Sequence, residues 1–134
     1  MMTITMATIE RVYKNGGQHA EQTFRYTMSG VICKADNKPS TECGDYADIQ
    51  IKSARATICK GKDIASHLAT DKAERYAYVT ADFKTAYIMS KVEYLAFATL
   101  FATLTRESEK NGGAEKMRLK SESKAMLEWL ESRV

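Results

Sequence analysis

Residues 44–55 read Gly-Asp-Tyr-Ala-Asp-Ile-Gln-Ile-Lys-Ser-Ala-Arg, and apolar and polar side chains alternate through the middle of this stretch. The apolar positions are Ala47, Ile49 and Ile51, and the polar positions between and beyond them are Asp48, Gln50 and Lys52. A period of two residues is typical of a β-strand with one buried face, so the pattern predicts a strand from Tyr46 to Lys52. The side chains of Asp48, Gln50 and Lys52 are then expected to share the opposite face.

A helix is predicted before this strand. Residues 18–29 follow the doublet Gly16-Gly17 and carry apolar side chains four residues apart, and Gly30 stands where a helix commonly ends. Residues 31–33 are a candidate short strand, and residues 35–44 have the Asp, Asn, Pro, Ser and Gly content of a loop. The strand of interest therefore follows a helix and a long connection.

Further strands are predicted after Arg55. Residues 56–59 are expected to be extended, and a short helix is expected from Ile64 to about Glu74. Residues 76–79 and 85–89 are rich in aromatic and β-branched side chains, which favours a hairpin with its turn at residues 82–84.

The remaining segments supply helices to cover the sheet. Ser90 and Glu93 have the spacing of a capping box in front of the apolar run 94–104, which predicts a largely buried helix over that run. A short strand around residues 117–119 and a final helix from about Glu122 are expected next, the helix having Met126, Trp129 and Leu130 on one face. Residues 3–13 fit either a strand or a helical turn.

These elements predict a single α+β domain over residues 1–134, with a central mixed β-sheet from the region 46–89 flanked by helices. A chain of 134 residues is long enough to close one hydrophobic core and too short for two domains. Its 20 basic and 17 acidic residues give a net charge of +3, so any strongly basic surface must be local.

The three cysteines favour a reducing compartment. Cys33, Cys43 and Cys59 are odd in number and contain no C-x-x-C pair, which suits free thiols better than disulfides. Their spacing, with His67 added, matches no familiar zinc ligand set. Because no apolar run is long enough to span a bilayer and no secretory pattern is present, we expect a cytoplasmic protein outside the membrane.

Side chains suited to phosphodiester hydrolysis gather around the central strand. That reaction needs a metal ion that polarises the phosphate and a positive group near the developing charge. Oxygen donors suit Mg²⁺, and Asp45 at the start of the strand with Gln50 inside it could supply them. Lys52 would lie on the same face as Gln50 and could contact the attacking water and the phosphate.

This arrangement resembles the PD-(D/E)XK nuclease superfamily, which includes restriction endonucleases, junction resolvases and mismatch-repair nicking enzymes. The resemblance covers about Gly16 to Arg55 and assigns Glu21 to the acidic position of the first helix, Asp45 to the aspartate and Gln50-Ile51-Lys52 to the E-x-K motif. It implies a restriction endonuclease-like fold and a Mg²⁺-dependent DNA endonuclease, with Mn²⁺ able to substitute, acting as a homodimer. The same resemblance implies nucleic-acid contacts by the basic exit of the strand, at Ser53, Arg55 and Lys60.

Two departures from the family pattern keep alternatives open. Gln50 stands where the family usually has a carboxylate, which lowers the negative charge of the site. Only four residues separate Asp45 from Gln50, so Asp36 or Asp48 is an alternative metal ligand.

Rival interpretations also follow from the sequence. A strand with Asp48, Gln50 and Lys52 on one face is also what an ordinary solvent-facing strand looks like, and the neutral Gln50 favours a non-catalytic nucleic-acid-binding or inhibitor protein on the same fold. His19 is a weaker candidate for the site. A basic cluster could contact phosphates, although a solvated face is the simpler interpretation; its members are Lys116, Arg118, Lys120 and Lys124. A set of tyrosines could stack on bases, although packing on a sheet face is the simpler interpretation; these are Tyr76, Tyr78, Tyr87 and Tyr94.

Overall fold

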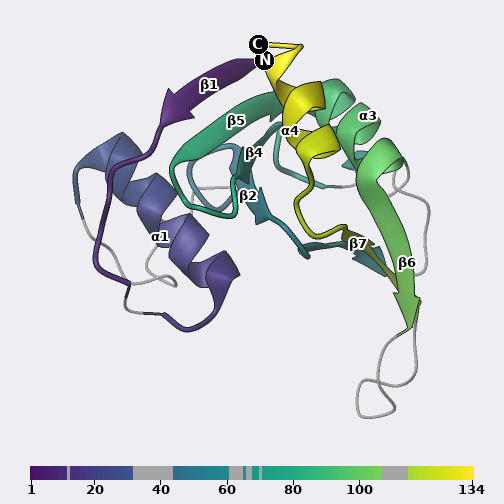
Figure 1. Ribbon diagram of the computed structural model, residues 1–134, viewed down its shortest axis with the longest axis horizontal. Helices are drawn as coiled ribbons and strands as arrows, with labels where there is room; N and C mark the ends of the chain where they lie inside the picture. Colours follow the sequence, from purple (N-terminus) through teal and green to yellow (C-terminus); the bar gives the residue numbers. More distant parts are fainter. Residues whose placement is uncertain (12, 32–43, 61–64, 66–67, 70, 107–114) are drawn as a thin grey trace.

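A mixed four-stranded sheet forms the centre of the computed structural model, which describes residues 1–11, 13–31, 44–60, 65, 68–69, 71–106 and 115–134 (Figure 1). Its strands are β1 (Met2–Thr5), β2 (Ile49–Ser53), β4 (Arg75–Val79) and β5 (Thr85–Ser90), in the order β1-β5-β4-β2. The pairs β1–β5 and β4–β5 are antiparallel and the pair β2–β4 is parallel. The predicted α+β class and central mixed sheet are therefore confirmed.

A second sheet of three strands lies beside the first. It contains β3 (Thr57–Lys60), β6 (Ala102–Arg106) and β7 (Glu115–Leu119), all antiparallel, in the order β3-β7-β6. The extended segment after Arg55 was expected in the central sheet, and this expectation is wrong. A tight turn at Ala54 and Arg55, where Arg55 has φ 66°, directs the chain out of the central sheet after β2.

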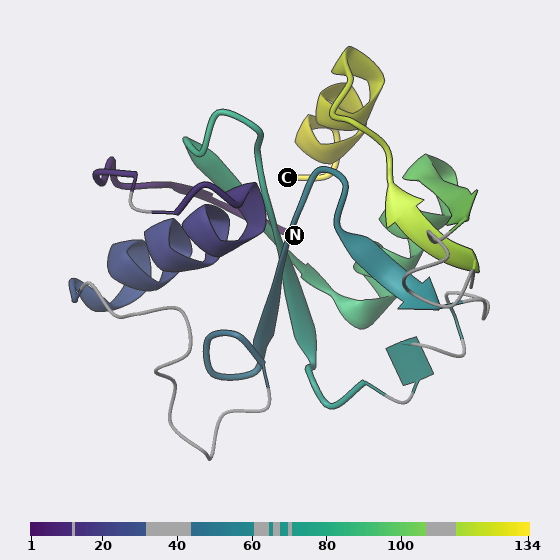
Figure 2. The same cartoon turned by 90° about the horizontal axis from the view of Figure 1, so that it is seen from below.

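One helix covers one face of the central sheet, and two helices with the second sheet cover the other face (Figure 2). Helix α1 (Gly16–Ser29) packs Ala20 and Phe24 against Ile49 and Ile51 of β2. On the other face lie α3 (Lys91–Phe101), α4 (Lys124–Glu131) and the second sheet. Their larger core is aromatic and includes Tyr76, Tyr78, Tyr94, Phe97, Met126 and Leu130.

Helix α3 ends earlier than its apolar run predicts. Ser90 and Glu93 form the expected capping box at its start, but the helix stops at Phe101 and Ala102 begins β6. The β-branched Thr103 and Thr105 suit a strand, and the pairing of β6 with β7 supplies backbone partners that the helix would otherwise provide. The helix is also less buried than expected, because Val92 and Leu100 are exposed. None of the described helices is long and apolar enough to cross a membrane.

The central strand begins at Ile49 and not at Tyr46. The preceding residues form a tight turn in which Tyr46 and Ile49 exchange backbone hydrogen bonds of 3.0 and 2.8 Å, and Ala47 has φ 52°. Gly44 belongs to this turn, because a Cβ at that position would lie 2.5 Å from the carbonyl oxygen of Ile49. Asp48 therefore precedes the strand and does not share the face of Gln50 and Lys52.

Most of the other expected helices and strands are confirmed, and two lie largely outside the described residues. The hairpin, the strand around residues 117–119 and the first and last helices are confirmed, and residues 2–5 form a strand. The candidate strand at residues 31–33 and the helix predicted from Ile64 lie largely outside the described residues.

Candidate functional site

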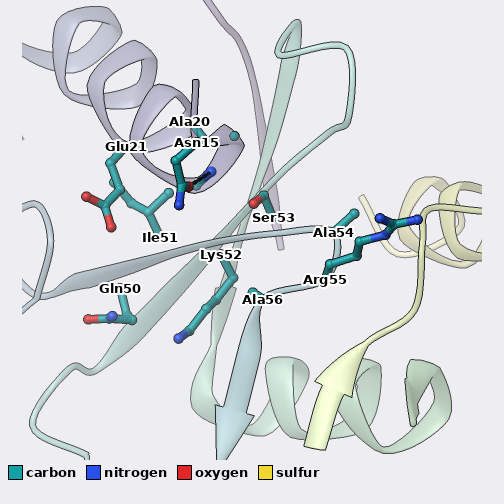
Figure 3. Close-up of a pocket in the computed structure, with 12 residues that line it drawn as sticks. Asn15, Ala20, Glu21, Gln50, Ile51, Lys52, Ser53, Ala54, Arg55 and Ala56 are labelled. Atoms are coloured by element: carbon teal, nitrogen blue, oxygen red, sulfur yellow. Dashed lines mark hydrogen bonds between the residues drawn. The ribbon is translucent and has the colours of Figure 1, made fainter. Parts of the chain in front are cut away.

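A pocket of about 520 Å³ lies between the N-terminal end of α1 and the C-terminal half of β2 (Figure 3). Residues from Asn15 to Glu21 form one wall, and residues 50–56 form the other. Among the described strands, β2 pairs with β4 alone, so its other edge is turned toward the pocket. The pocket thus combines a helix start, a strand edge and the turn that leads into β3.

The first wall of the pocket depends on the cap of α1. The side chain of Asn15 accepts hydrogen bonds from the backbone N–H groups of Gly17 and Gln18, at 2.8 and 3.2 Å, and starts the helix there. Glu21 follows one turn later and lines the pocket. The cap was not predicted, although an Asn before a Gly-Gly doublet is a recognisable start signal.

Lys52 is the central charged group of the site. Its Nζ donates to the backbone oxygen of Thr57 over 3.2 Å. Burial lowers the pKa of Lys52 below its ordinary value, and the carboxylates of Asp45, Asp71 and Glu21 act in the opposite direction. A partly desolvated ammonium group therefore lies within the field of three carboxylates.

Three of the four predicted catalytic residues line this pocket. Gln50 and Lys52 project from the same face of β2, and Glu21 approaches from α1. Figure 3 shows Glu21 on the α1 side of β2, Gln50 and Lys52 on the other side of the strand, and Arg55 beyond the end of the strand. The structure therefore brings a carboxylate, an amide and an ammonium group together from two elements far apart in sequence.

Asp45, the fourth predicted residue, does not line the pocket. Its Oδ2 accepts a hydrogen bond of 2.8 Å from the backbone N–H of Ile51, and its backbone oxygen accepts one of 3.0 Å from Arg25 Nη1. The carboxylate thus supplies a hydrogen-bond acceptor to the backbone N–H of Ile51, which lies between Gln50 and Lys52 on β2. Its first role is to hold this part of the strand in position.

Two substitutions of Asp45 test whether its hydrogen bond to Ile51, and not its negative charge, stabilises the fold. An amide oxygen can still accept from Ile51, so we expect Asp45→Asn to unfold at the same urea concentration as the wild type. Asp45→Ala leaves that N–H without its partner and should lower the free energy of unfolding by about 1–3 kcal/mol. Equal stability of the two variants would show that the cap is unimportant.

Of the two alternative metal ligands, Asp36 and Asp48, the structure describes Asp48. Both carboxylate oxygens of Asp48 accept from Arg75, at 2.7 and 2.8 Å, and this pair lowers the pKa of Asp48. The pair ties the start of β2 to the start of β4 and makes Asp48 a poor metal ligand. Asp36 lies outside the described residues.

The donor set can be compared with the needs of Mg²⁺. Among the described residues, no three His, Cys, Asp or Glu side chains converge as a metal centre would require. The pocket offers the Glu21 carboxylate and the Gln50 amide oxygen, and Asp45 adds negative charge nearby. Carboxylate and amide oxygens are donors that Mg²⁺ takes, and Mg²⁺ commonly keeps several waters beside one or two carboxylates. Of the zinc candidates, Cys33, Cys43 and His67 lie outside the described residues.

The predicted nucleic-acid contacts lie at the exit of β2. Ser53 and Arg55 line the pocket, and Arg55 Nε donates to Ser121 Oγ over 3.0 Å, which fixes its guanidinium near the chain between β7 and α4. Lys60 ends β3, but its side chain is outside the described part of the structure.

Asp71 is a neighbour of the site that sequence reasoning missed. Its Oδ2 accepts from the Tyr76 hydroxyl over 2.7 Å, and its backbone oxygen accepts from Lys91 Nζ over 2.6 Å. Its charge acts on Lys52 although the two residues are 19 positions apart in the sequence. Only the parallel pairing of β2 with β4 brings them together, so no local pattern signals it.

His19 lies in a different pocket from Glu21. It is 5% exposed, its ring meets that of Phe83 edge-on at 4.6 Å, and its Nδ1 has no hydrogen-bond partner. Its small cavity of about 140 Å³ is also lined by Thr23, Asp82 and Lys84. His19 is therefore a core residue and not part of the site at Lys52.

The stability of the protein should fall at mildly acidic pH because of His19. Burial, followed by the charge of Arg11, lowers the pKa of His19 below 6.5, so the unfolded state binds this proton more readily than the folded state. Stability is then complete above about pH 7 and declines as the pH falls below the unfolded pKa. Urea unfolding at pH 5 and pH 8 measures this decline, which should be smaller in His19→Phe. An unchanged pH dependence in the variant would contradict it.

Comparison with protein-family models, with curated proteins and with solved structures finds no match to this chain. A function is therefore assigned from the residues and geometry of the site alone.

Proposed function

We propose that this protein is a metal-dependent DNA endonuclease that hydrolyses phosphodiester bonds at the pocket between α1 and β2. The observation that carries the proposal is the meeting of Glu21, Gln50 and Lys52 in that one pocket. Residues at these positions also carry the resemblance to the PD-(D/E)XK superfamily. The mixed sheet, with the Gln50-Ile51-Lys52 strand beside a helix that bears Glu21, is compatible with a restriction endonuclease-like fold.

Each side chain has a distinct task in this proposal. Glu21 and Gln50, with the charge of Asp45, hold Mg²⁺ or Mn²⁺, which supplies Lewis-acid polarisation of the phosphate and a more acidic water when bound. Lys52 donates hydrogen bonds to a phosphate oxygen and stabilises the negative charge that grows there during attack. Its position is fixed by the Thr57 carbonyl, so little reorganisation is needed as the charge develops.

Burial lowers the pKa of Lys52, and the neighbouring carboxylates oppose this shift. Burial alone favours the neutral amine, but the three neighbouring carboxylates favour the ammonium form. In this proposal Lys52 acts in its ammonium form, as an electrostatic group at the phosphate.

The direct test is cleavage of supercoiled, linear and branched DNA by the purified protein, with Mg²⁺, with Mn²⁺ and with EDTA. We expect cutting with either metal and none with EDTA. If folded protein cuts none of these substrates with either metal, the endonuclease proposal is wrong. Preference for supercoiled or branched DNA would point to a nicking or resolvase-like activity, and sequence-specific cutting of linear DNA to restriction.

A second candidate is a non-catalytic nucleic-acid-binding or inhibitor protein built on the same fold. The observation that favours it is the weak donor set, in which Gln50 is neutral and one oxygen of Asp45 is already bonded to Ile51. Such a protein would bind DNA equally well with and without a metal and would cut nothing. A metal titration of DNA binding therefore separates the two candidates.

We further propose that the protein acts in the cytoplasm as a homodimer. One site of this kind cuts one strand, so a double-strand break requires two copies. The free thiols expected from the cysteine pattern suit a reducing compartment. Analytical ultracentrifugation across a range of protein concentrations tests the dimer.

A further inference from the structure

The outer face of the β3-β7-β6 sheet differs in character from its inner face. On β7, Leu119 is buried in the aromatic core and Met117 packs against it. Because side chains alternate along a strand, Lys116 and Arg118 belong to the opposite, outer face. The inner face closes the core, and the outer face carries the positive charge of the sheet.

The neighbouring strands add hydroxyl groups to this outer face. Arg118 is paired with Thr57 of β3 and with Thr103 of β6, and Lys116 is paired with Thr105. Directly paired residues point to the same side of a sheet, so these threonines surround the two basic side chains. The outer face therefore combines cationic groups with hydroxyl donors.

This face is continuous with the pocket. The Thr57 carbonyl that accepts from Lys52 Nζ belongs to the same residue that is paired with Arg118. The bond between Arg55 and Ser121 links the turn before β3 to the chain after β7. In Figure 3, β3 leaves the pocket beside Lys52 and Ala56. The register thus places Arg118 beside Thr57 next to the pocket, and Lys116 two residues away along β7.

We propose that the outer face of the β3-β7-β6 sheet binds the sugar–phosphate backbone of duplex DNA beside the bond that is cut. The inference rests on the proposed endonuclease, whose substrate must extend beyond a pocket that holds only a short part of it. Lysine and arginine neutralise phosphates, and threonine hydroxyls donate to phosphate oxygens. Contacts of this kind position the DNA without reading its sequence.

The test is DNA binding by Lys116→Ala/Arg118→Ala, measured by fluorescence anisotropy of a labelled duplex in EDTA at several salt concentrations. Loss of two phosphate contacts should weaken binding roughly tenfold at low salt and reduce the slope of log affinity against log salt by roughly 2. The control is Lys84→Ala/Arg133→Ala, which also removes one lysine and one arginine, from exposed positions on the β4–β5 turn and after α4. The control should keep the wild-type slope.

Thr103→Glu is a second test of this face, in case Lys116→Ala/Arg118→Ala does not fold. Thr103 is exposed, so the substitution adds a negative charge to the face without removing a buried atom. It should also weaken DNA binding while leaving thermal unfolding unchanged. Wild-type binding and slope in both this variant and the double variant would overturn the inference, as would a wild-type protein that binds no duplex.

Cleavage measured beside binding separates this inference from the proposed function. If the wild type cuts DNA and the double variant binds and cuts equally well, the face is not used and the endonuclease stands. If no protein cuts but the double variant loses affinity and salt dependence, the face binds DNA and the endonuclease is wrong. A duplex RNA of equal length shows whether the phosphate chemistry is shared by both nucleic acids.

Discussion

Lys52→Ala should abolish most of the DNA cutting, with a fall in rate of about 10²–10³-fold under saturating metal. Two effects add in this variant. The phosphate loses the ammonium group that stabilises its developing charge, and the carboxylates of Glu21, Asp45 and Asp71 lose the cation that offsets them. The unbalanced negative charge should repel the phosphate. The measurement is the single-turnover rate of nicking of supercoiled DNA.

The stability of Lys52→Ala distinguishes a catalytic loss from unfolding. Because the desolvated ammonium group is costly to bury, its removal should leave the melting temperature close to that of the wild type. Lys84→Ala removes an exposed lysine at the β4–β5 turn and should cut normally. Lys52→Arg keeps the charge, but a planar guanidinium cannot reproduce the position of the ammonium group at the Thr57 carbonyl, so partial activity is expected. Full activity in folded Lys52→Ala would remove Lys52 from the mechanism.

The sequence predicts the elements of this fold better than their ends. Alternation over residues 47–52 locates β2 because one face of the strand is buried against α1. It cannot locate the start of the strand, since Tyr46 and Ala47 continue the pattern while the backbone turns at Ala47. The change from α3 to β6 is hidden for a similar reason: the run 94–104 is uncharged and mostly apolar throughout, and the pairing with β7 decides where the helix ends.

The candidate site is predictable where its residues lie on one regular element. Gln50 and Lys52 are two residues apart on a strand, and this spacing alone places them on one face. The position of Asp45 depends on a turn, where its carboxylate caps Ile51, and no period governs a turn. Asp71 depends on the parallel pairing of distant strands. The basic outer face of the second sheet likewise requires β3 and β6 to meet β7.

Gln50→Glu should increase the affinity of the site for Mg²⁺. The substitution restores the carboxylate of the E-x-K pattern and places a second negative side chain in the pocket beside Glu21. One added charge at about 4 Å from a cation is worth on the order of 1–4 kcal/mol, so half-maximal cutting should need roughly tenfold less Mg²⁺. The added carboxylate should also raise the pKa of Lys52 and keep it protonated. A Mg²⁺ titration of the nicking rate measures the first effect.

Metal binding measured without DNA gives the matched comparison. The rise in melting temperature with Mg²⁺ should be larger for Gln50→Glu than for the wild type and smaller for Gln50→Leu, which has no oxygen donor. Position 50 is of intermediate exposure, and Glu keeps the length of the Gln side chain while Leu is one bond shorter, so the comparison tests mainly the donor atom. If all three proteins respond equally to Mg²⁺, Gln50 is not a ligand. The weak donor set would then belong to a protein that binds DNA through charge alone, and the pocket would hold a phosphate beside Lys52 without a metal.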